Sequence, residues 1–145
     1  MPTRFKLLTI PDIKVEWEIF HKMRALETNG ICKVNLYLEQ LKSRNTTEYR
    51  KVLKLFKLCG ANERLFNPNY IKPHKKHTGI YELKIKTGFS RISFFYYKNS
   101  LSYIICISAY WKEKDYKQKE QDLFFERSAE IMEIFLSTEH TGGNK

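Results

Sequence analysis

The chain has 145 residues, of which 42% are hydrophobic, and this suits a single globular domain with one core. With 26 Lys and Arg against 16 Asp and Glu, the net charge of +10 favours an anionic partner such as nucleic acid or an acidic protein. No apolar run approaches the roughly 20 residues of a membrane span, and the first residues lack the apolar region of a signal peptide, so we expect a cytoplasmic protein with no membrane partner.

The three cysteines predict no redox or metal site. Cys32, Cys59 and Cys106 lie in apolar or helical runs and lack the CxxC spacing of zinc and redox motifs. We therefore interpret them as buried thiols. Neither a metal ion nor another cofactor is expected.

The first part of the chain is expected to hold a short arm and one strand. Residues 1–12 form the arm, and residues 15–20 (VEWEIF) alternate polar and apolar side chains as a strand does. A helix that continues through Arg24 is the alternative interpretation of the same segment.

Two helices are expected to follow as an antiparallel hairpin. Residues 32–44 present an apolar side and a charged side at helical spacing. The second helix begins at Asn45, where Glu48 three residues on gives a capping-box-like start, and it ends at Gly60. Its apolar stripe consists of Val52, Leu55, Phe56 and Cys59.

Residues 61–78 are expected to form a loop that concentrates positive charge. The loop contains Pro68 and Pro73, which interrupt regular structure. It ends in a basic cluster that consists of His74, Lys75, Lys76 and His77.

The segment 79–97 (GIYELKIKTGFSRISFFYY) predicts a hairpin with one apolar face and one cationic face. Its first strand alternates between a charged set and an apolar set, which are Glu82, Lys84 and Lys86 against Tyr81, Leu83 and Ile85. A turn at Gly88 follows. The second strand has Arg91 and Ser93 on the charged side, with Ile92, Phe94 and Tyr96 on the apolar side.

The register of this hairpin is expected to bring like charges together. If the apolar sets stay on one face, Lys86 falls opposite Arg91, and Lys84 falls opposite Ser93. Directly opposed cations destabilise a strand pair, and a bound polyanion would relieve the repulsion.

The remaining elements complete one α+β domain over residues 1–145. Residues 101–110 form a nearly continuous apolar strand, which is typical of a central position covered on both faces. A last helix covers residues 118–136, and residues 138–145 form a disordered tail. We expect a helical hairpin and a C-terminal helix packed on one face of a small antiparallel sheet, with the charge on the opposite face or its rim.

Four segments in the second half of the chain carry a family pattern. Their matching positions are Tyr81, Glu82, Leu83 and Lys84 in one strand, Arg91, Ile92 and Phe95 in the next, Lys112 and Lys114 in a turn, and Glu126 and Ala129 in the last helix. This order, over residues 31–136, resembles the RelE/HigB toxins of bacterial type II toxin-antitoxin systems. The phage-derived HigB-like branch is the most similar, with “lYElR” and “yRi.y” strands before a lysine-rich turn and an “E....A” helix.

The resemblance implies a RelE-like fold and a ribosome-dependent messenger-RNA endonuclease that acts in the ribosomal A site. It also implies a small antitoxin protein that wraps around the toxin and silences it. Two positions depart from the pattern. Lys84 stands where the branch often has arginine, which keeps the charge and loses the bidentate fork. The usual paired lysines are broken into Lys112, Glu113 and Lys114.

RNA cleavage without a metal needs a base for the 2′-hydroxyl proton, an acid for the leaving 5′-oxygen, and cations that stabilise the phosphorane. Clustered Lys and Arg can supply all three, because surrounding positive charge lowers the pKa of a lysine. Lys84 and Lys86 are the candidates for base and electrostatic stabiliser, and Arg91 is the candidate phosphate clamp. Lys112 or Lys114 is expected to reach the same phosphate from the adjacent strand.

The RNA-binding candidates surround this catalytic set. They are His74, Lys75, Lys76 and His77 in the basic loop, and Tyr110, Trp111 and Tyr116 after the apolar strand. The histidines titrate in the range for acid or base work, and the tyrosines can stack on a base or donate a proton. Trp111 is either a stacking side chain or a hydrophobic anchor. Glu82 is interpreted as a structural partner of a neighbouring lysine.

Two other functions stay open. A ParE-like toxin shares the fold and inhibits DNA gyrase without needing a cationic catalytic face. A non-catalytic basic module binds RNA or ribosomes with strong salt sensitivity. The charged hairpin favours the endonuclease.

Overall fold

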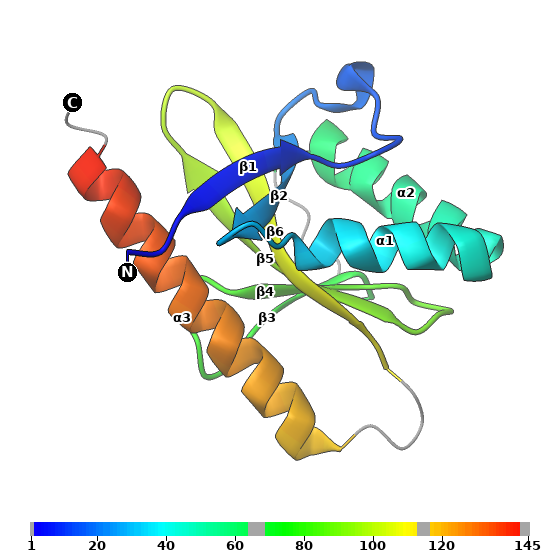
Figure 1. Ribbon diagram of the computed structural model, residues 1–145. Coiled ribbons are helices and arrows are strands. Elements are labelled where there is room, and N and C mark those ends of the chain that lie inside the picture. Colours follow the sequence, from blue (N-terminus) through cyan, green and yellow to red (C-terminus); the bar gives the residue numbers. More distant parts are fainter. Residues whose placement is uncertain (1, 64–68, 113–116, 143–145) are drawn as a thin grey trace.

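The computed structural model describes residues 2–63, 69–112 and 117–142. Its elements in chain order are β1 (Phe5–Thr9), β2 (Lys22–Thr28), α1 (Lys33–Arg44), α2 (Thr46–Ala61), β3 (Ile71–Pro73), β4 (Tyr81–Lys84), β5 (Ser90–Lys98), β6 (Ser102–Trp111) and α3 (Gln118–Gly142). The strands form one sheet in the order β1-β2-β6-β5-β4-β3 (Figure 1). Neighbouring strands are antiparallel except β2 and β6, which are parallel. The expected α+β class is confirmed.

The N-terminal segment differs from the expectation. The expected arm contains β1, and the expected strand over residues 15–20 is wrong, because the chain forms a single 3-10 turn at Val15–Trp17. Val15 is 77% exposed and Ile19 is 68% exposed, so two apolar side chains of the expected strand lie in solvent. The strand is instead β2, which pairs with both β1 and β6 and buries its centre.

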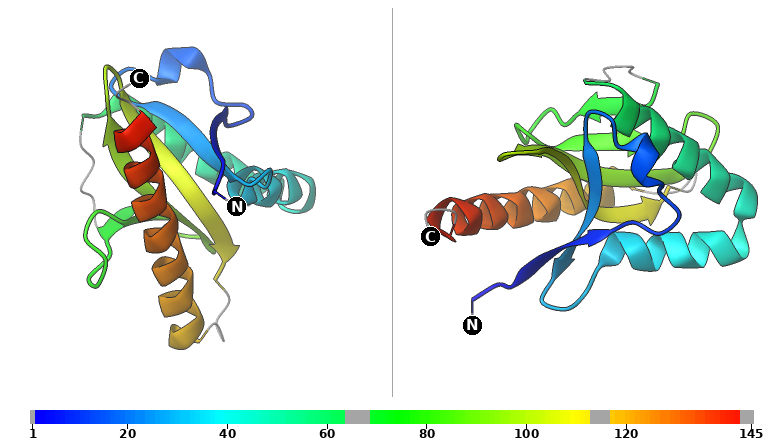
Figure 2. Two further views of the ribbon diagram at one scale, coloured as in Figure 1. Left: turned by 60° about the vertical axis from the view of Figure 1, so that its left-hand side comes forward. Right: turned by 90° about the horizontal axis from the view of Figure 1, so that it is seen from above.

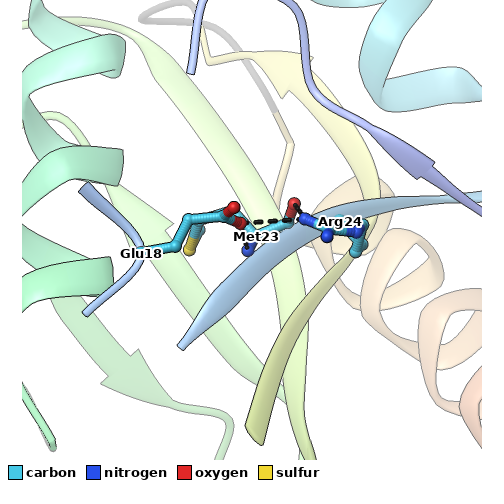
Figure 3. Close-up of polar contacts among 3 residues, drawn as sticks. All are labelled: Glu18, Met23 and Arg24. Carbon is cyan, nitrogen blue, oxygen red and sulfur yellow. Dashed lines mark hydrogen bonds and ion pairs between the residues drawn. The ribbon is translucent and has the colours of Figure 1, made fainter. Parts of the chain in front are cut away.

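Glu18 fixes the start of β2. Its carboxylate accepts hydrogen bonds from the backbone N–H of Met23 and from the guanidinium of Arg24, which also donates to the Met23 carbonyl (Figure 3). The Glu18–Arg24 ion pair is 2.8 Å long. Because a buried carboxylate is costly without such donors, these contacts hold the 3-10 turn against the strand.

The two-helix hairpin is confirmed. Asn45 caps α2, since its Oδ1 accepts the backbone N–H of Glu48 at 3.1 Å. The backbone N–H of Asn45 donates to the Leu41 carbonyl at 2.7 Å, so it needs no reciprocal contact from the Glu48 side chain. α2 ends at Ala61, and Gly60 lies within its last turn, where a Cβ atom would come within 2.5 Å of the Trp17 carbonyl oxygen.

The helices cover both faces of the sheet, so the expectation of a single covered face is wrong. α1 and α2 pack on the face that carries Ile92, whereas α3 crosses the face that carries Phe95 (Figure 2). Because side chains alternate along a strand, Arg91 and Ser93 also lie on the α3 face. Ser93 Oγ is 2.8 Å from Ser128 Oγ of α3. The charged face of the hairpin is therefore partly covered by a helix.

The remaining expectations concern β6, the C-terminus and the cysteines. β6 occupies a central position and its apolar core is buried, as its composition predicts. α3 continues to Gly142, so the segment expected as a disordered tail is helical as far as that residue. Cys32, Cys59 and Cys106 are buried free thiols, as predicted. In the described ranges, no helix has the length and apolar character needed to cross a membrane.

Candidate functional site

A cavity of about 440 Å³ lies where β3, β4 and β5 face the first turns of α3. Among the described residues, its lining includes six cations and two carboxylates, together with His74, Pro73, Gln118, Gln121 and Phe125. The cations are Lys72, Lys75, Lys76, Lys84, Arg91 and Lys112, and the carboxylates are Glu82 and Asp122. We call this space the cationic cavity. The excess of positive charge fits an anionic ligand.

Lys84 and Arg91 both line the cationic cavity and lie directly opposite each other on β4 and β5. The expected register, with Lys86 opposite Arg91, is wrong by two residues. β4 ends at Lys84, and the N–H of Ile85 donates to the Ser90 carbonyl at 3.4 Å, so Lys86 lies in the turn. A shift of two residues leaves every side chain on its expected face, because the strand period is two.

Lys86 is the predicted catalytic residue that the fold removes from the site. It is exposed in the β4–β5 turn and does not line the cationic cavity. The alternating pattern assigned it to the correct face, but the strand ends before reaching it. The expected pair of Lys84 and Lys86 is therefore replaced by Lys84 and Arg91.

Arg91 is a buried cation, with 8% of its surface exposed. Its Nη1 donates to the carbonyl of Ser90 at 3.0 Å. No carboxylate in the described part of the chain lies within ion-pair distance of its guanidinium. A desolvated guanidinium with several N–H donors and no partner anion is suited to a phosphate or carboxylate of a ligand.

The pKa of Lys84 is lowered from its ordinary value. Burial is the largest cause, and the positive charges of Lys72 and Arg91 add to it, while Glu82 acts in the opposite direction. An ammonium with a lowered pKa is a stronger acid than an ordinary lysine. This arrangement follows from the cross-strand pairing of two cations.

Glu82 is a lining residue of the cationic cavity that the sequence analysis left out of the catalytic set. It lines the cationic cavity on the same face as Lys84, two residues along β4. Burial raises its pKa above the ordinary value, although Arg91 and Lys112 pull the pKa back down. No described cation lies within ion-pair distance of its carboxylate, although Lys72 lies directly opposite Glu82 on the neighbouring strand.

Lys72 and Lys112 reach the cationic cavity from the two sides of the hairpin. Lys72 lies on β3 opposite Glu82, and this three-residue strand was not expected because the segment contains Pro73. Lys112 follows β6, and its backbone N–H donates to the Phe89 carbonyl at 2.7 Å. The predicted Lys114 and Tyr116 lie outside the described residues.

The basic loop contributes three of its four predicted residues to the cavity lining, which are His74, Lys75 and Lys76. His74 stacks on Phe125 of α3 with 4.4 Å between ring centroids and on His77 with 5.0 Å. Burial, followed by the nearby His77, lowers the pKa of His74. The imidazole is therefore biased toward its neutral form.

Tyr110 and Trp111 do not line the cationic cavity. Tyr110 packs edge-on against Phe124 at 4.5 Å. Trp111 stacks on Phe89 at 4.7 Å and borders a second cavity of about 400 Å³ beside α1, on the opposite face of the sheet. Of the two open interpretations of Trp111, these contacts favour the hydrophobic anchor.

The first turns of α3 supply lining residues that no sequence pattern indicated. Gln118, Gln121, Asp122 and Phe125 close the cationic cavity from above the sheet. Asp122 Oδ2 lies 3.9 Å from Lys76 Nζ, and Gln118 Nε2 donates to Asp122 Oδ1 at 2.9 Å. Their participation depends on α3 crossing the charged face, which local periodicity does not reveal.

Metal-ligating side chains are not gathered in this region. Within the described ranges, no group of three or more His, Cys, Asp or Glu side chains has the proximity needed to hold a metal ion. The chain matches no protein-family model and no curated protein. We therefore infer the function from the geometry of the cationic cavity and from the motif spacing.

Proposed function

We propose that the protein is an endoribonuclease that binds the phosphate backbone of RNA in the cationic cavity. The observation that carries this proposal is the direct pairing of Lys84 with the buried Arg91 in a cavity that also contains Glu82. Two opposed cations and a partly buried carboxylate supply phosphate binding and proton transfer in one place. The volume of about 440 Å³ is compatible with a nucleotide.

In the proposed reaction the 2′-hydroxyl oxygen attacks the adjacent phosphorus, and the bond from phosphorus to the 5′-oxygen breaks. The products are a 2′,3′-cyclic phosphate and a free 5′-hydroxyl. Glu82 accepts the 2′-hydroxyl proton, because its raised pKa makes it a better base than an ordinary glutamate. Lys84 donates a proton to the leaving oxygen, because its lowered pKa makes it a better acid.

The other lining residues hold the substrate. Arg91 clamps the scissile phosphate, and Lys72 and Lys112 stabilise the charge that builds on it. His74, held by stacking on Phe125 and His77, lines the cavity beside the cations. Lys75 and Lys76 bind the backbone further along the strand.

The biological setting follows from the motif spacing. We infer that the chain is the toxin of a type II toxin-antitoxin pair, cuts messenger RNA in the ribosomal A site, acts in the cytoplasm and is held inactive by a cognate antitoxin protein. The support is the order of the Tyr81–Lys84 strand, Arg91 and Lys112 ahead of the last helix. The role as a toxin on the ribosome is a more specific proposal than RNA cleavage.

Controlled expression tests the proposal. Wild-type protein is expected to stop translation and to leave cut transcripts, while the Lys84→Ala, Arg91→Ala double variant is expected to fold and to do neither. DNA damage with intact messenger RNA would instead indicate a gyrase-directed toxin. Salt-sensitive RNA binding without cuts or toxicity would indicate a non-catalytic module.

A further inference from the structure

A buried carboxylate on the opposite side of the sheet is connected to the cationic cavity. Glu48, on the first turn of α2, is 4% exposed and reaches the β4–β5 turn. Its Oε2 accepts three hydrogen bonds, from the backbone N–H of Phe89 at 2.9 Å and from the N–H and Oγ of Ser90 at 2.7 Å each. One oxygen of the carboxylate thus holds two consecutive residues.

The same two residues hold two cations of the cavity through their carbonyl groups. The Phe89 carbonyl accepts the backbone N–H of Lys112 at 2.7 Å. The Ser90 carbonyl accepts Nη1 of Arg91 at 3.0 Å. The Phe89–Ser90 peptide therefore donates its N–H to Glu48 and supports Lys112 through its carbonyl. Ser90, which Glu48 holds through both its N–H and its Oγ, supports Arg91 through its own carbonyl. When a peptide N–H donates to a charged acceptor, the hydrogen bond that the carbonyl of the same peptide accepts also becomes stronger, because linked hydrogen bonds polarise one another.

The surroundings of Glu48 are built to accept this side chain. A Cβ atom at Gly88 would overlap the Glu48 carboxylate at 2.1 Å, so only glycine leaves room for it. The Tyr37 hydroxyl lies 2.6 Å from Ser90 Oγ, and Lys51 Nζ donates to Thr87 Oγ1 at 3.1 Å. Helices α1 and α2 thus hold the turn from one side of the sheet.

We propose that Glu48 is a positioning residue for the RNA-cleaving site: it fixes Phe89 and Ser90, whose carbonyl groups set the places of Lys112 and Arg91. The inference rests on the proposed function for its consequence in catalysis. Its structural part, the connection from Glu48 to the two cations, does not depend on that function. Displacing a catalytic group by about 1 Å costs on the order of 100-fold in rate.

Glu48→Gln is the decisive variant, because glutamine has the same shape and loses the charge. The amide oxygen still accepts hydrogen bonds, but an N–H₂ group replaces the second oxygen and the charge-assisted strength is lost. Tyr49→Phe is the matched control. It lies next to Glu48 on α2, removes a 2.6 Å hydrogen bond to Asp12, and makes no hydrogen bond to the turn.

In steady-state RNA cleavage, Glu48→Gln is expected to lower kcat by about tenfold or more while KM changes by less than about threefold. Tyr49→Phe is expected to leave both parameters within about twofold of the wild type, even where its stability loss equals that of Glu48→Gln. If kcat falls in both variants in proportion to their loss of stability, the positioning role is overturned.

Amide hydrogen exchange decides the inference without using activity. In Glu48→Gln, the N–H of Lys112 is expected to exchange about fivefold faster or more, and Tyr49→Phe is expected to leave it unchanged. If wild-type protein cuts no RNA, the proposed function fails, and this exchange measurement still tests the connection. Unchanged Lys112 exchange in folded Glu48→Gln would refute it.

Ser90→Ala is the alternative test variant if Glu48→Gln does not fold. It removes one of the three donors to Glu48 and leaves no buried charge unpaired. Lys112 exchange is then expected to rise by about twofold to threefold. No change in that exchange rate would count against the proposal.

Discussion

Lys84 and Arg91 lie directly opposite each other on β4 and β5, and Arg91 is buried at that position. Like charges in a cross-strand pair destabilise a sheet, so this pairing is retained at a cost in stability. An anion bound between the two side chains would turn the repulsion into two attractive contacts. The pairing is therefore the feature from which the main predictions follow.

Arg91→Ala is expected to reduce RNA cleavage by about 100-fold or more, because it removes the buried donors that stabilise the charged transition state. Lys86→Ala is the control, since Lys86 lies in the same hairpin and outside the cationic cavity. Initial rates of cleavage of a short RNA provide the measurement. Equal losses in the two variants would show that general positive charge, and not the cavity, is responsible.

Glu82→Gln is expected to abolish cleavage and to stabilise the protein at neutral pH. Burial raises the pKa of Glu82, so its ionised form is disfavoured in the folded state. The stability advantage of glutamine is therefore complete above the folded pKa and disappears as pH falls below the ordinary value of 4.5. Unfolding midpoints of both proteins across this pH range check the sign. A Glu82→Gln variant that is less stable at neutral pH would contradict it.

Lys84 is expected to give cleavage an alkaline limit below that of an ordinary lysine. Its lowered pKa means that it loses its proton, and with it the ability to act as an acid, at a lower pH than the ordinary 10.5. Lys84→Arg keeps the charge at high pH and cannot donate the proton. The variant is expected to bind RNA with wild-type affinity and to cut it slowly at every pH. Wild-type rates in Lys84→Arg would exclude the acid role.

Gly60→Ala is expected to destabilise the protein by about 1–2 kcal/mol. Alanine is favoured over glycine in a helix by about 1 kcal/mol, but the added Cβ would come within 2.5 Å of the Trp17 carbonyl oxygen. Overpacking against backbone costs about 1–3 kcal/mol, and the backbone cannot rotate away as a flexible side chain does. Denaturant unfolding measures the difference. A more stable variant would mean that the 3-10 turn moves freely.

The sequence predicted the helices and the faces of the hairpin, because these depend on local periodicity. The stripe of α2 and the alternation in β4 and β5 both hold in the structure. The first strand was wrong because residues 15–20 alternate by composition alone, whereas β2 is fixed by its pairing with β1 and β6. Pairing between distant strands leaves no signal in a single segment.

The sequence predicts part of the lining of the cationic cavity but not all of it. Alternation predicts the face of Lys84 and Arg91 but leaves shifts of two residues open, which is why Lys86 was paired with Arg91. Glu48 was interpreted as a helix-capping residue, and its contact with Ser90 spans 42 positions in the chain. The residues of α3 line the cationic cavity only because α3 crosses this face of the sheet, and no local pattern in the sequence indicates that crossing.

The most direct test of RNA cleavage in the cationic cavity is the chemistry of the cut ends. Purified wild-type protein and the Lys84→Ala, Arg91→Ala variant are incubated with messenger RNA on translating ribosomes, and the termini are mapped. The account predicts 2′,3′-cyclic phosphate and 5′-hydroxyl ends with the wild type and uncut RNA with the variant. Intact RNA with the wild type, or equal cutting by both proteins, would contradict it.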